Sequence, residues 1–269
     1  MARLGSVDGK IEWAEQHLGD LEAQIRDFHG RKPYEVVTQQ HPQQSDQSQM
    51  VLRIREEIPD AIALRAGDIA HNLRSALDHL GCLAVKRNSG AVTSDTAFPI
   101  RRREGTPTAN ETKSLVYSKV KGASAAVIQE MLRLQPYEEG NDESLWALNY
   151  LDIVDKHRIL IAGLATHESV NIDFGARMQE TLRGIPEFAD WQVPKLVLGL
   201  RPAERFPLHE GYVLYEAPTE EVAKGNPSFT FDIALGEPQI LEGKPMLPVL
   251  TDLAQAVRAT VDLFRPLLY

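Results

Sequence analysis

One short stretch of the sequence, residues 68–82, is unusually rich in side chains that could do chemistry. It reads Asp-Ile-Ala-His-Asn-Leu-Arg-Ser-Ala-Leu-Asp-His-Leu-Gly-Cys. At about 100° per residue, its polar side chains follow two adjacent lines on one helix surface. The first line holds Asp68, Asn72, Ser75 and His79, and the second holds His71, Arg74 and Asp78. Histidine titrates near neutrality and a guanidinium fork matches a phosphate, so these residue types suit acid–base chemistry on a phosphate-containing substrate.

A second polar cluster, residues 152–158, lies in another apolar segment and reads Asp-Ile-Val-Asp-Lys-His-Arg. It adds Asp155, His157 and Arg158 to the candidate binding residues. The spacing places His157 on an apolar helix face with Tyr150 and Ile153, so its ring is expected to point into the core.

Both clusters also allow a structural interpretation. Asp152 and Lys156 are four residues apart, as are Arg74 and Asp78, and each pair predicts an intrahelical ion pair. His71, His157 and Asp155 could likewise hydrogen-bond between helices and set the register of a bundle.

A metal site made of His71 or His79 with His157 and Asp155 is a further alternative, because bundle cores host such centres. His71 and His79 are eight residues apart, however, which turns them about 80° out of register. The sequence also lacks Glu-x-x-His, so we predict no metal and no cofactor. It contains no glycine-rich phosphate loop, His-Glu-x-x-His, Cys-x-x-Cys or Gly-x-Ser-x-Gly, which disfavours nucleotide, dinucleotide and serine-hydrolase chemistry of the usual kinds.

The elements that must position these clusters are predicted to be long helices. Residues 9–29 place apolar side chains at alternating three- and four-residue steps, the seam of a long packed helix. A second helix starts near Pro59 and ends near Lys86–Gly90. Ser124 is a plausible N-cap of a helix that Pro136 stops, and residues 144–164 form the helix of the second cluster. Residues 91–112 are expected to be irregular.

Strands are predicted at 34–39 and 50–55, joined by a polar, glutamine-rich turn. After residue 170 the period becomes two, and further strands are predicted at 170–174, 194–200, 211–215 and 229–233. The expected fold is α+β: a bundle of about four to five helices with a β-hairpin and an appended antiparallel sheet. We assign 1–165 to the bundle with its hairpin at about 34–55. Residues 166–244 form the β region, and 245–269 a last helix that packs back on the bundle.

The amino-acid composition limits the class of protein and its expected location. The chain is 43% hydrophobic and 25% charged, as in ordinary globular proteins, and its longest apolar run, 159–165, is too short to span a membrane. The N-terminus lacks the apolar core of a signal peptide, and the single Cys82 excludes an internal disulfide. We therefore expect a cytoplasmic protein with no membrane partner.

Charge is unevenly distributed along the chain. The net charge of −9 argues against nonspecific coating of nucleic acid. Residues 61–123 nevertheless carry ten Lys/Arg and five Asp/Glu, with Arg101–Arg103 at the centre of the excess. This run is either a solvated loop or a rim that binds phosphate.

Arg74 and His79, separated by four residues on a predicted bundle helix, resemble the Arg-x(4–6)-His motif of ribonucleases in the HEPN superfamily. The resemblance implies a metal-independent ribonuclease, or a protein that binds RNA or nucleotides. His79 would transfer protons and Arg74 would neutralise the phosphorane charge. Five residues of helix turn the two side chains about 140° apart. Because members of this superfamily resemble one another in pairing two motifs across a cleft, the resemblance also implies a homodimer.

A longer series of motifs is similar to a family of uncharacterised bacterial and phage-associated proteins. The series is Gly67-Asp-x-x-His-Asn-Leu-Arg-Ser-Ala-Leu-Asp-His-Leu, Phe98-Pro-Ile, Gln135-Pro-Tyr and Asp155-Lys-His-Arg. This resemblance implies no activity, but it suggests a bacterial or phage-defence setting. The alternative to a ribonuclease is thus a non-enzymatic binding or scaffold protein whose polar clusters are structural, and whether the protein is an enzyme stays open at this point.

Overall fold

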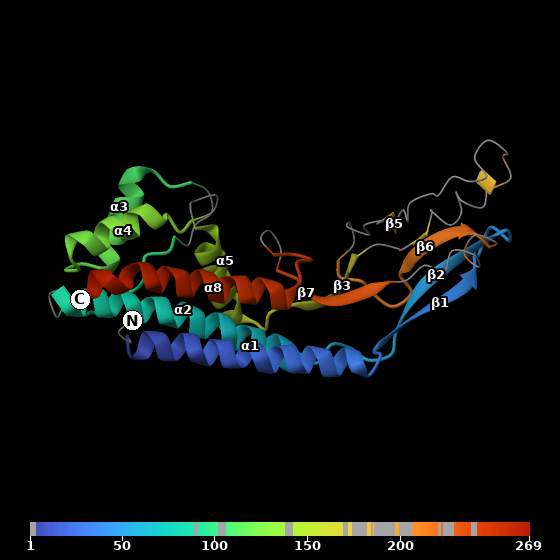
Figure 1. The fold of residues 1–269 in the computed structure, drawn as a ribbon, viewed down its shortest axis with the longest axis horizontal. Coiled ribbons are helices and arrows are strands. Elements are labelled where there is room, and N and C mark those ends of the chain that lie inside the picture. Colours follow the sequence, from blue (N-terminus) through green and yellow to red (C-terminus); the bar gives the residue numbers. More distant parts are fainter. Residues whose placement is uncertain are drawn as a thin grey trace. The chain divides into compact units, whose positions relative to one another are not determined.

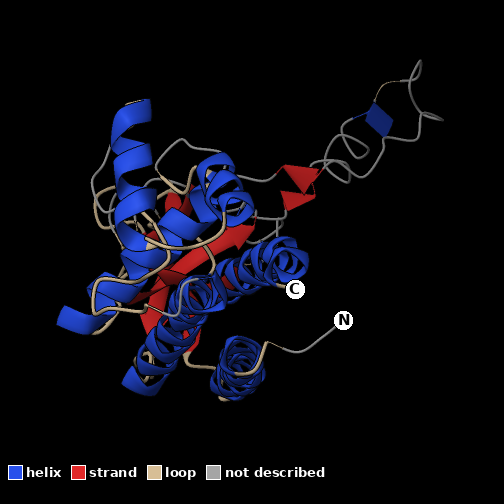
Figure 2. Ribbon diagram, turned by 90° about the vertical axis from the view of Figure 1, so that its left-hand side faces the viewer, coloured by secondary structure: helices blue, strands red, loops and turns tan. Residues whose placement is uncertain are grey.

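Three long helices carry the apolar stripes that the sequence predicts. In the computed structural model they are α1 (Ser6–Gly30), α2 (Asp60–Asn88) and α8 (Met246–Phe264), followed by a short 3-10 turn, Arg265–Leu268. They lie side by side in Figure 1 and are seen from their ends in Figure 2. The structure describes residues 4–88, 91–101, 106–137, 142–168, 172–173, 182–183, 185, 197–198, 206–219, 222, 229–237 and 241–269.

The stripes form one helical core, as predicted. Buried members include Ile11 and Leu21 of α1, Leu73 and Leu77 of α2, and Val257 of α8. Helix α8 packs against both α2 and α5 (Glu143–His157), so the C-terminal helix does return to the bundle. Burying such side chains contributes about 1.5 to 3 kcal/mol each before the entropy of ordering them is subtracted.

Two shorter helices complete the helical part. Helix α4 (Ala125–Leu134) begins, as expected, after Ser124, whose hydroxyl accepts from the Val127 amide. Helix α3 (Ala109–Lys119) was not expected, because residues 91–112 read as irregular. Its signal was present: Thr108 and Glu111 form a capping box, the Ser/Thr-x-x-Glu pattern that marks a helix start.

The helix of the second polar cluster is shorter than predicted. We expected residues 144–164, but α5 stops at His157 and Arg158 is already extended. The next residues form strand β3 (Ala162–Glu168), which pairs antiparallel with β7 (Thr230–Leu235). Glu237 accepts a hydrogen bond from the Ile161 amide at 2.9 Å, just before β3 begins. The apolar residues up to 164 have a spacing that suits a helix, but the last of them belong to a strand whose partner is distant in sequence.

Contacts divide the chain into two units. Unit 1 comprises residues 1–25, 59–161 and 237–269, and unit 2 comprises residues 26–58 and 162–236. Unit 2 contains the predicted hairpin, β1 (Tyr34–Gln40) and β2 (Gln47–Ile54), in register Tyr34↔Ile54. Strand β6 (Val213–Pro218) pairs with β2, so the hairpin belongs to a three-stranded sheet rather than standing alone in the bundle.

The remaining strands of unit 2 are short. Strands β4 (Ile172–Asp173) and β5 (Val197–Leu198) pair with each other, and the rest of the strands expected at 170–174 and 194–200 lies outside the described residues. Leu52, Leu164 and Leu208 form the buried core of this unit, with Tyr34 and Phe231 packed against it. The predicted α+β class is confirmed, with separate small antiparallel sheets in place of one larger sheet.

Candidate functional site

Arg74 lies at the centre of a buried hydrogen-bond network in unit 1. Its Nε donates to Asn149 Oδ1 at 2.9 Å, one terminal nitrogen donates to Asp78 Oδ1 at 2.6 Å, and the other donates to the Phe98 carbonyl at 3.3 Å. Arg74 is only 8% exposed. Its guanidinium is therefore occupied within its own chain, and this network is the one that the structural interpretation of Arg74 and Asp78 requires.

The network holds the segment 96–101 against α2. Asp78 Oδ1 also accepts the Phe98 amide at 2.9 Å, so both backbone groups of Phe98 bond to this ion pair. A β-carbon on Gly81 would come within 2.9 Å of the Ala97 carbonyl carbon, so glycine permits this close approach. The Phe98 ring packs edge-on to Phe264 at 5.9 Å. The polar motif of α2 thus fixes a piece of irregular chain.

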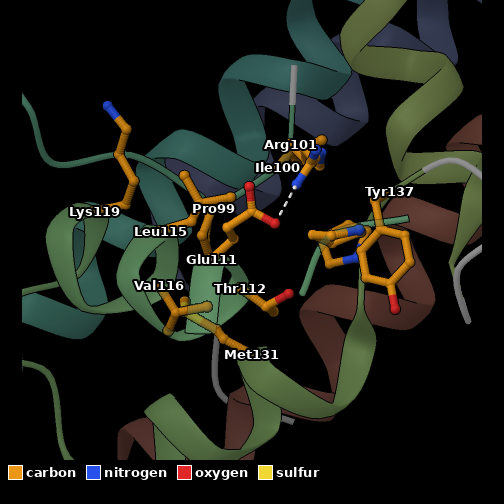
Figure 3. Close-up of a pocket in the computed structure, with 12 residues that line it drawn as sticks. Pro99, Ile100, Arg101, Glu111, Thr112, Leu115, Val116, Lys119, Met131 and Tyr137 are labelled. Atoms are coloured by element: carbon orange, nitrogen blue, oxygen red, sulfur yellow. Dashed lines mark ion pairs between the residues drawn. The ribbon is translucent and has the colours of Figure 1, made fainter. Parts of the chain in front are cut away.

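Beside this segment lies a cavity of about 280 Å³ (Figure 3). The segment supplies one wall, and α3, α4 and the turn after α4 supply the others. Apolar side chains predominate, with five polar or charged side chains among them. The lining residues are Pro99, Ile100, Arg101, Pro107, Glu111, Thr112, Leu115, Val116, Lys119, Met131, Pro136 and Tyr137. A concave apolar cavity with a few polar groups is the usual form of a small-molecule site.

The polar groups of the cavity already have hydrogen-bond or ion-pair partners within the protein. Arg101 faces Glu111 across 3.7 Å, the dashed pair in Figure 3. Glu111 also accepts from the Thr108 amide and hydroxyl, and these bonds, more than Arg101, hold its pKa below the ordinary value. The hydroxyl of Thr112 donates to the Thr108 carbonyl, and that of Tyr137 donates to Gln135. A ligand in this cavity would therefore be held mainly by apolar contact.

A second polar arrangement joins α2 to α5. His71 Nδ1 lies 2.9 Å from Asp152 Oδ1, while Lys156 Nζ binds the other oxygen of the same carboxylate. The Asp152 side chain is 3% exposed and that of His71 is 48% exposed. His71 thus bonds between helices as the structural interpretation expects, but its partner is Asp152 and not Asp155. Asp152–Lys156 confirms the expected intrahelical ion pair.

Asp155 lies beside this pair, against the backbone of Gly67. A β-carbon on Gly67 would overlap the Asp155 carboxylate, so any side chain at position 67 would have to displace Asp155. Burial raises the pKa of Asp155, and the negative charges of Asp68 and Asp152 raise it further. No three His, Cys, Asp or Glu side chains in the described ranges are grouped so that they could hold a metal ion.

The other candidate residues point in different directions. Asn72 turns toward α1, where its Oδ1 accepts from Lys10 Nζ at 2.8 Å. His79 is partly buried, and its Nδ1 has no hydrogen-bond partner among the described residues. The expectation that His157 points into the core is wrong: α5 ends at this residue and its side chain is exposed. Arg158 donates to the fully buried Glu237 at 2.7 Å.

Sequence reasoning missed three parts of these arrangements. Asn149 precedes Asp152 by one helical turn, so it could have been placed on the same face of α5. Glu237 and the cavity had no comparable signal, because both depend on contacts between segments far apart in the chain. Of the basic run, only Arg101 falls within the described residues.

No helix in the part of the chain that the structure describes is both long and apolar enough to cross a membrane. Comparisons with known proteins add no relative: no protein-family model, no curated protein and no solved structure matches this chain.

Proposed function

We propose that this protein binds a small, largely apolar molecule in the cavity between the 96–101 segment, α3 and α4. The observation that carries the proposal is the cavity itself, about 280 Å³ in volume and walled mainly by apolar side chains. This volume is close to the lower end of the range of small-molecule sites, about 300 to 1,000 Å³. The ligand should be compact, of the size of one or two fused rings.

The polar motif of α2 supports this function indirectly. Arg74, Asp78 and Gly81 hold the 96–101 segment in place, and Pro99 to Arg101 of that segment line the cavity. A rigid wall lowers the entropic cost of binding because the site does not have to be ordered by the ligand. The residues that resemble a nuclease motif are, in this proposal, the support of a binding site.

The ribonuclease alternative is less well supported by the geometry. It needs the Arg74 guanidinium to meet a phosphate, and all three of its nitrogens already bond to Asn149, Asp78 and Phe98. The half-exposed His71, rather than His79, is the histidine whose ring is oriented by a carboxylate. For a nuclease working through Arg74, the network would first have to break.

The binding proposal is tested with naphthalene derivatives as probes. The fluorescence of 1-anilinonaphthalene-8-sulfonate should rise saturably with the folded wild type. Leu115→Trp, which fills the cavity, should abolish the rise. Tyr117→Trp adds tryptophan at an exposed position of the same helix and should leave the rise intact. Matching melting curves for the three proteins would exclude probe binding to unfolded chain.

Methyl NMR locates the probe independently. With ¹³C-methyl methionine, the Met131 signal should shift on addition of naphthalene, because Met131 lines the cavity. Met246 is fully buried in α8 and serves as the internal control. Equal probe binding by Leu115→Trp, or an unmoved Met131 signal, would overturn the proposal. RNA cleavage without metal that His79→Ala abolishes would favour the ribonuclease instead.

A further inference from the structure

Ser75, His71 and Asp152 form a chain of contacts on the surface of unit 1. The Ser75 hydroxyl lies 3.5 Å from His71 Nε2, and His71 Nδ1 lies 2.9 Å from Asp152 Oδ1. Ser75 and His71 are one helical turn apart on α2, and Asp152 reaches them from α5. The order hydroxyl, imidazole, buried carboxylate is that of an activated serine.

The chemistry of the carboxylate fixes the direction of these bonds. An ionised carboxylate only accepts, so His71 Nδ1 must carry the hydrogen that faces Asp152. In the neutral ring, Nε2 then carries the lone pair, and the Ser75 hydroxyl is the donor to it. Asp152 is held from its other side by Lys156 Nζ, so it cannot easily turn away. Half of the His71 side chain remains exposed, which leaves Nε2 accessible to a substrate.

We infer that Ser75 is a nucleophile activated by His71, with Asp152 as the positioning residue, and that it accepts acyl groups from activated esters. Ser75 Oγ bonds to the carbonyl carbon while its proton passes to His71 Nε2. The ester C–O bond then breaks, and the departing alkoxide or phenolate takes that proton from His71 Nε2. Water, deprotonated by the same nitrogen, later releases the acid and restores the Ser75 hydroxyl.

Local structure limits which esters can react. Ser75 lies inside α2, where backbone amides bond within the helix and none is left to stabilise an oxyanion. Loss of one such donor costs about 10²- to 10³-fold in rate, so only esters with a good leaving group should react. The charge of Asp155 and its neighbour Asp68 adds a second limit. It should repel anionic esters and favour neutral or cationic ones.

The test follows acetylation of the whole chain by 4-nitrophenyl acetate. Nitrophenol release and peptide mass spectrometry should show one acetyl group on Ser75, lost in Ser75→Ala and formed at least tenfold more slowly in His71→Gln. Ser114→Ala removes an exposed serine of α3 and should behave as wild type. The anionic ester 4-nitrophenyl succinate should react more slowly than the acetate.

The role of Asp152 needs its own readout. In ¹⁵N NMR, the His71 ring should show hydrogen on Nδ1 in the wild type and lose that preference in Asp152→Asn. Should Asp152→Asn fail to fold, Ser75→Ala and His71→Gln still decide the proposal. Acetylation confined to lysines, or proceeding unchanged in His71→Gln, would overturn it. The result is independent of naphthalene binding in the cavity.

Discussion

The Asp155 carboxylate occupies the space that a side chain at Gly67 would need. Glycine inside a helix normally costs about 1 kcal/mol relative to alanine, and here it makes room for a charged group from α5.

Gly67→Ala should not give the stability that alanine usually adds to a helix, because the new methyl group must displace Asp155. In an Asp155→Ala background the same change should add about 1 kcal/mol. Gly19 lies in α1 with nothing near its missing β-carbon, so Gly19→Ala should be stabilising in both backgrounds. Denaturant unfolding of the wild type, the two single variants at 67 and 155 and their double variant measures the coupling, and the two Gly19→Ala proteins are the control. Equal effects of Gly67→Ala in both backgrounds would contradict the packing described.

Arg74→Ala should destabilise the protein by about 3 kcal/mol, since it leaves Asp78, Asn149 and the Phe98 carbonyl without their donor. The partial exposure of Asp78 keeps this value at the lower end for a buried ion pair. The control is Arg133→Ala in the exposed pair with Glu130, which should cost at most about 1 kcal/mol. If Arg74→Ala unfolds no more easily than the control, the structural role of Arg74 is wrong.

Asp155→Asn should stabilise the protein at neutral pH and have no effect at low pH. The pKa of Asp155 is raised in the folded state, so the native protein holds its proton to a higher pH than the unfolded chain does. Wild-type stability therefore falls as pH rises from the ordinary value of 3.8 through the raised pKa. The side chain is partly exposed, and solvent screens its charge, so the gain above that window should be only about 0.5 kcal/mol.

A carboxylate of opposite behaviour provides the comparison for this pH experiment. Hydrogen bonding to Arg133 lowers the pKa of Glu130, so its contribution is present above the ordinary pKa and is lost as pH falls through the lowered one. Glu130→Gln should therefore destabilise at neutral pH, where Asp155→Asn stabilises. Thermal unfolding of both variants and the wild type across pH 3 to 8 measures these differences. A destabilising Asp155→Asn or a stabilising Glu130→Gln at neutral pH would contradict the direction of the corresponding pKa shift.

Gly81→Ala should cost about 1 to 3 kcal/mol, because its β-carbon would press on the backbone of Ala97 and not on a side chain that can turn aside. The same shift would move Pro99 and Ile100, so naphthalene binding should weaken as well. Gly9→Ala, in open space on α1, is the matched change that should leave binding unaltered. If Gly81→Ala is destabilised but binds the probe with normal affinity, then the close approach at Gly81 does not determine the shape of the cavity.

The helical part of the fold could be predicted because local patterns agreed with long-range packing. The seam of α1, the proline before α2 and the Ser124 cap each indicated an element that the structure contains. The pattern at 158–164 did not suffice, because its apolar residues suit either a helix or a strand. Pairing with β7 and the buried Glu237 decided the outcome, and neither could be located from the local sequence.

The candidate site was predictable only in part. Ion pairs four residues apart, Arg74–Asp78 and Asp152–Lys156, follow from helix geometry alone. Whether a polar residue faces solvent or a neighbouring segment depends on the partner, and Phe98 is 24 residues from Arg74. Arg74 and His71 lie on one line of the helix, yet Arg74 is buried and His71 is half exposed, because different segments pack against them.

The segments of the two units alternate along the sequence, and this limits how the protein can fold during synthesis and where it can be truncated. The helical unit uses residues from both ends of the described chain, and α8 contributes to its core from residue 246 onward. During synthesis that core stays open until α8 has left the ribosome, whereas every earlier helix has already emerged. A truncation before residue 237 would remove α8, which packs against both α2 and α5, so no single cut yields two intact halves.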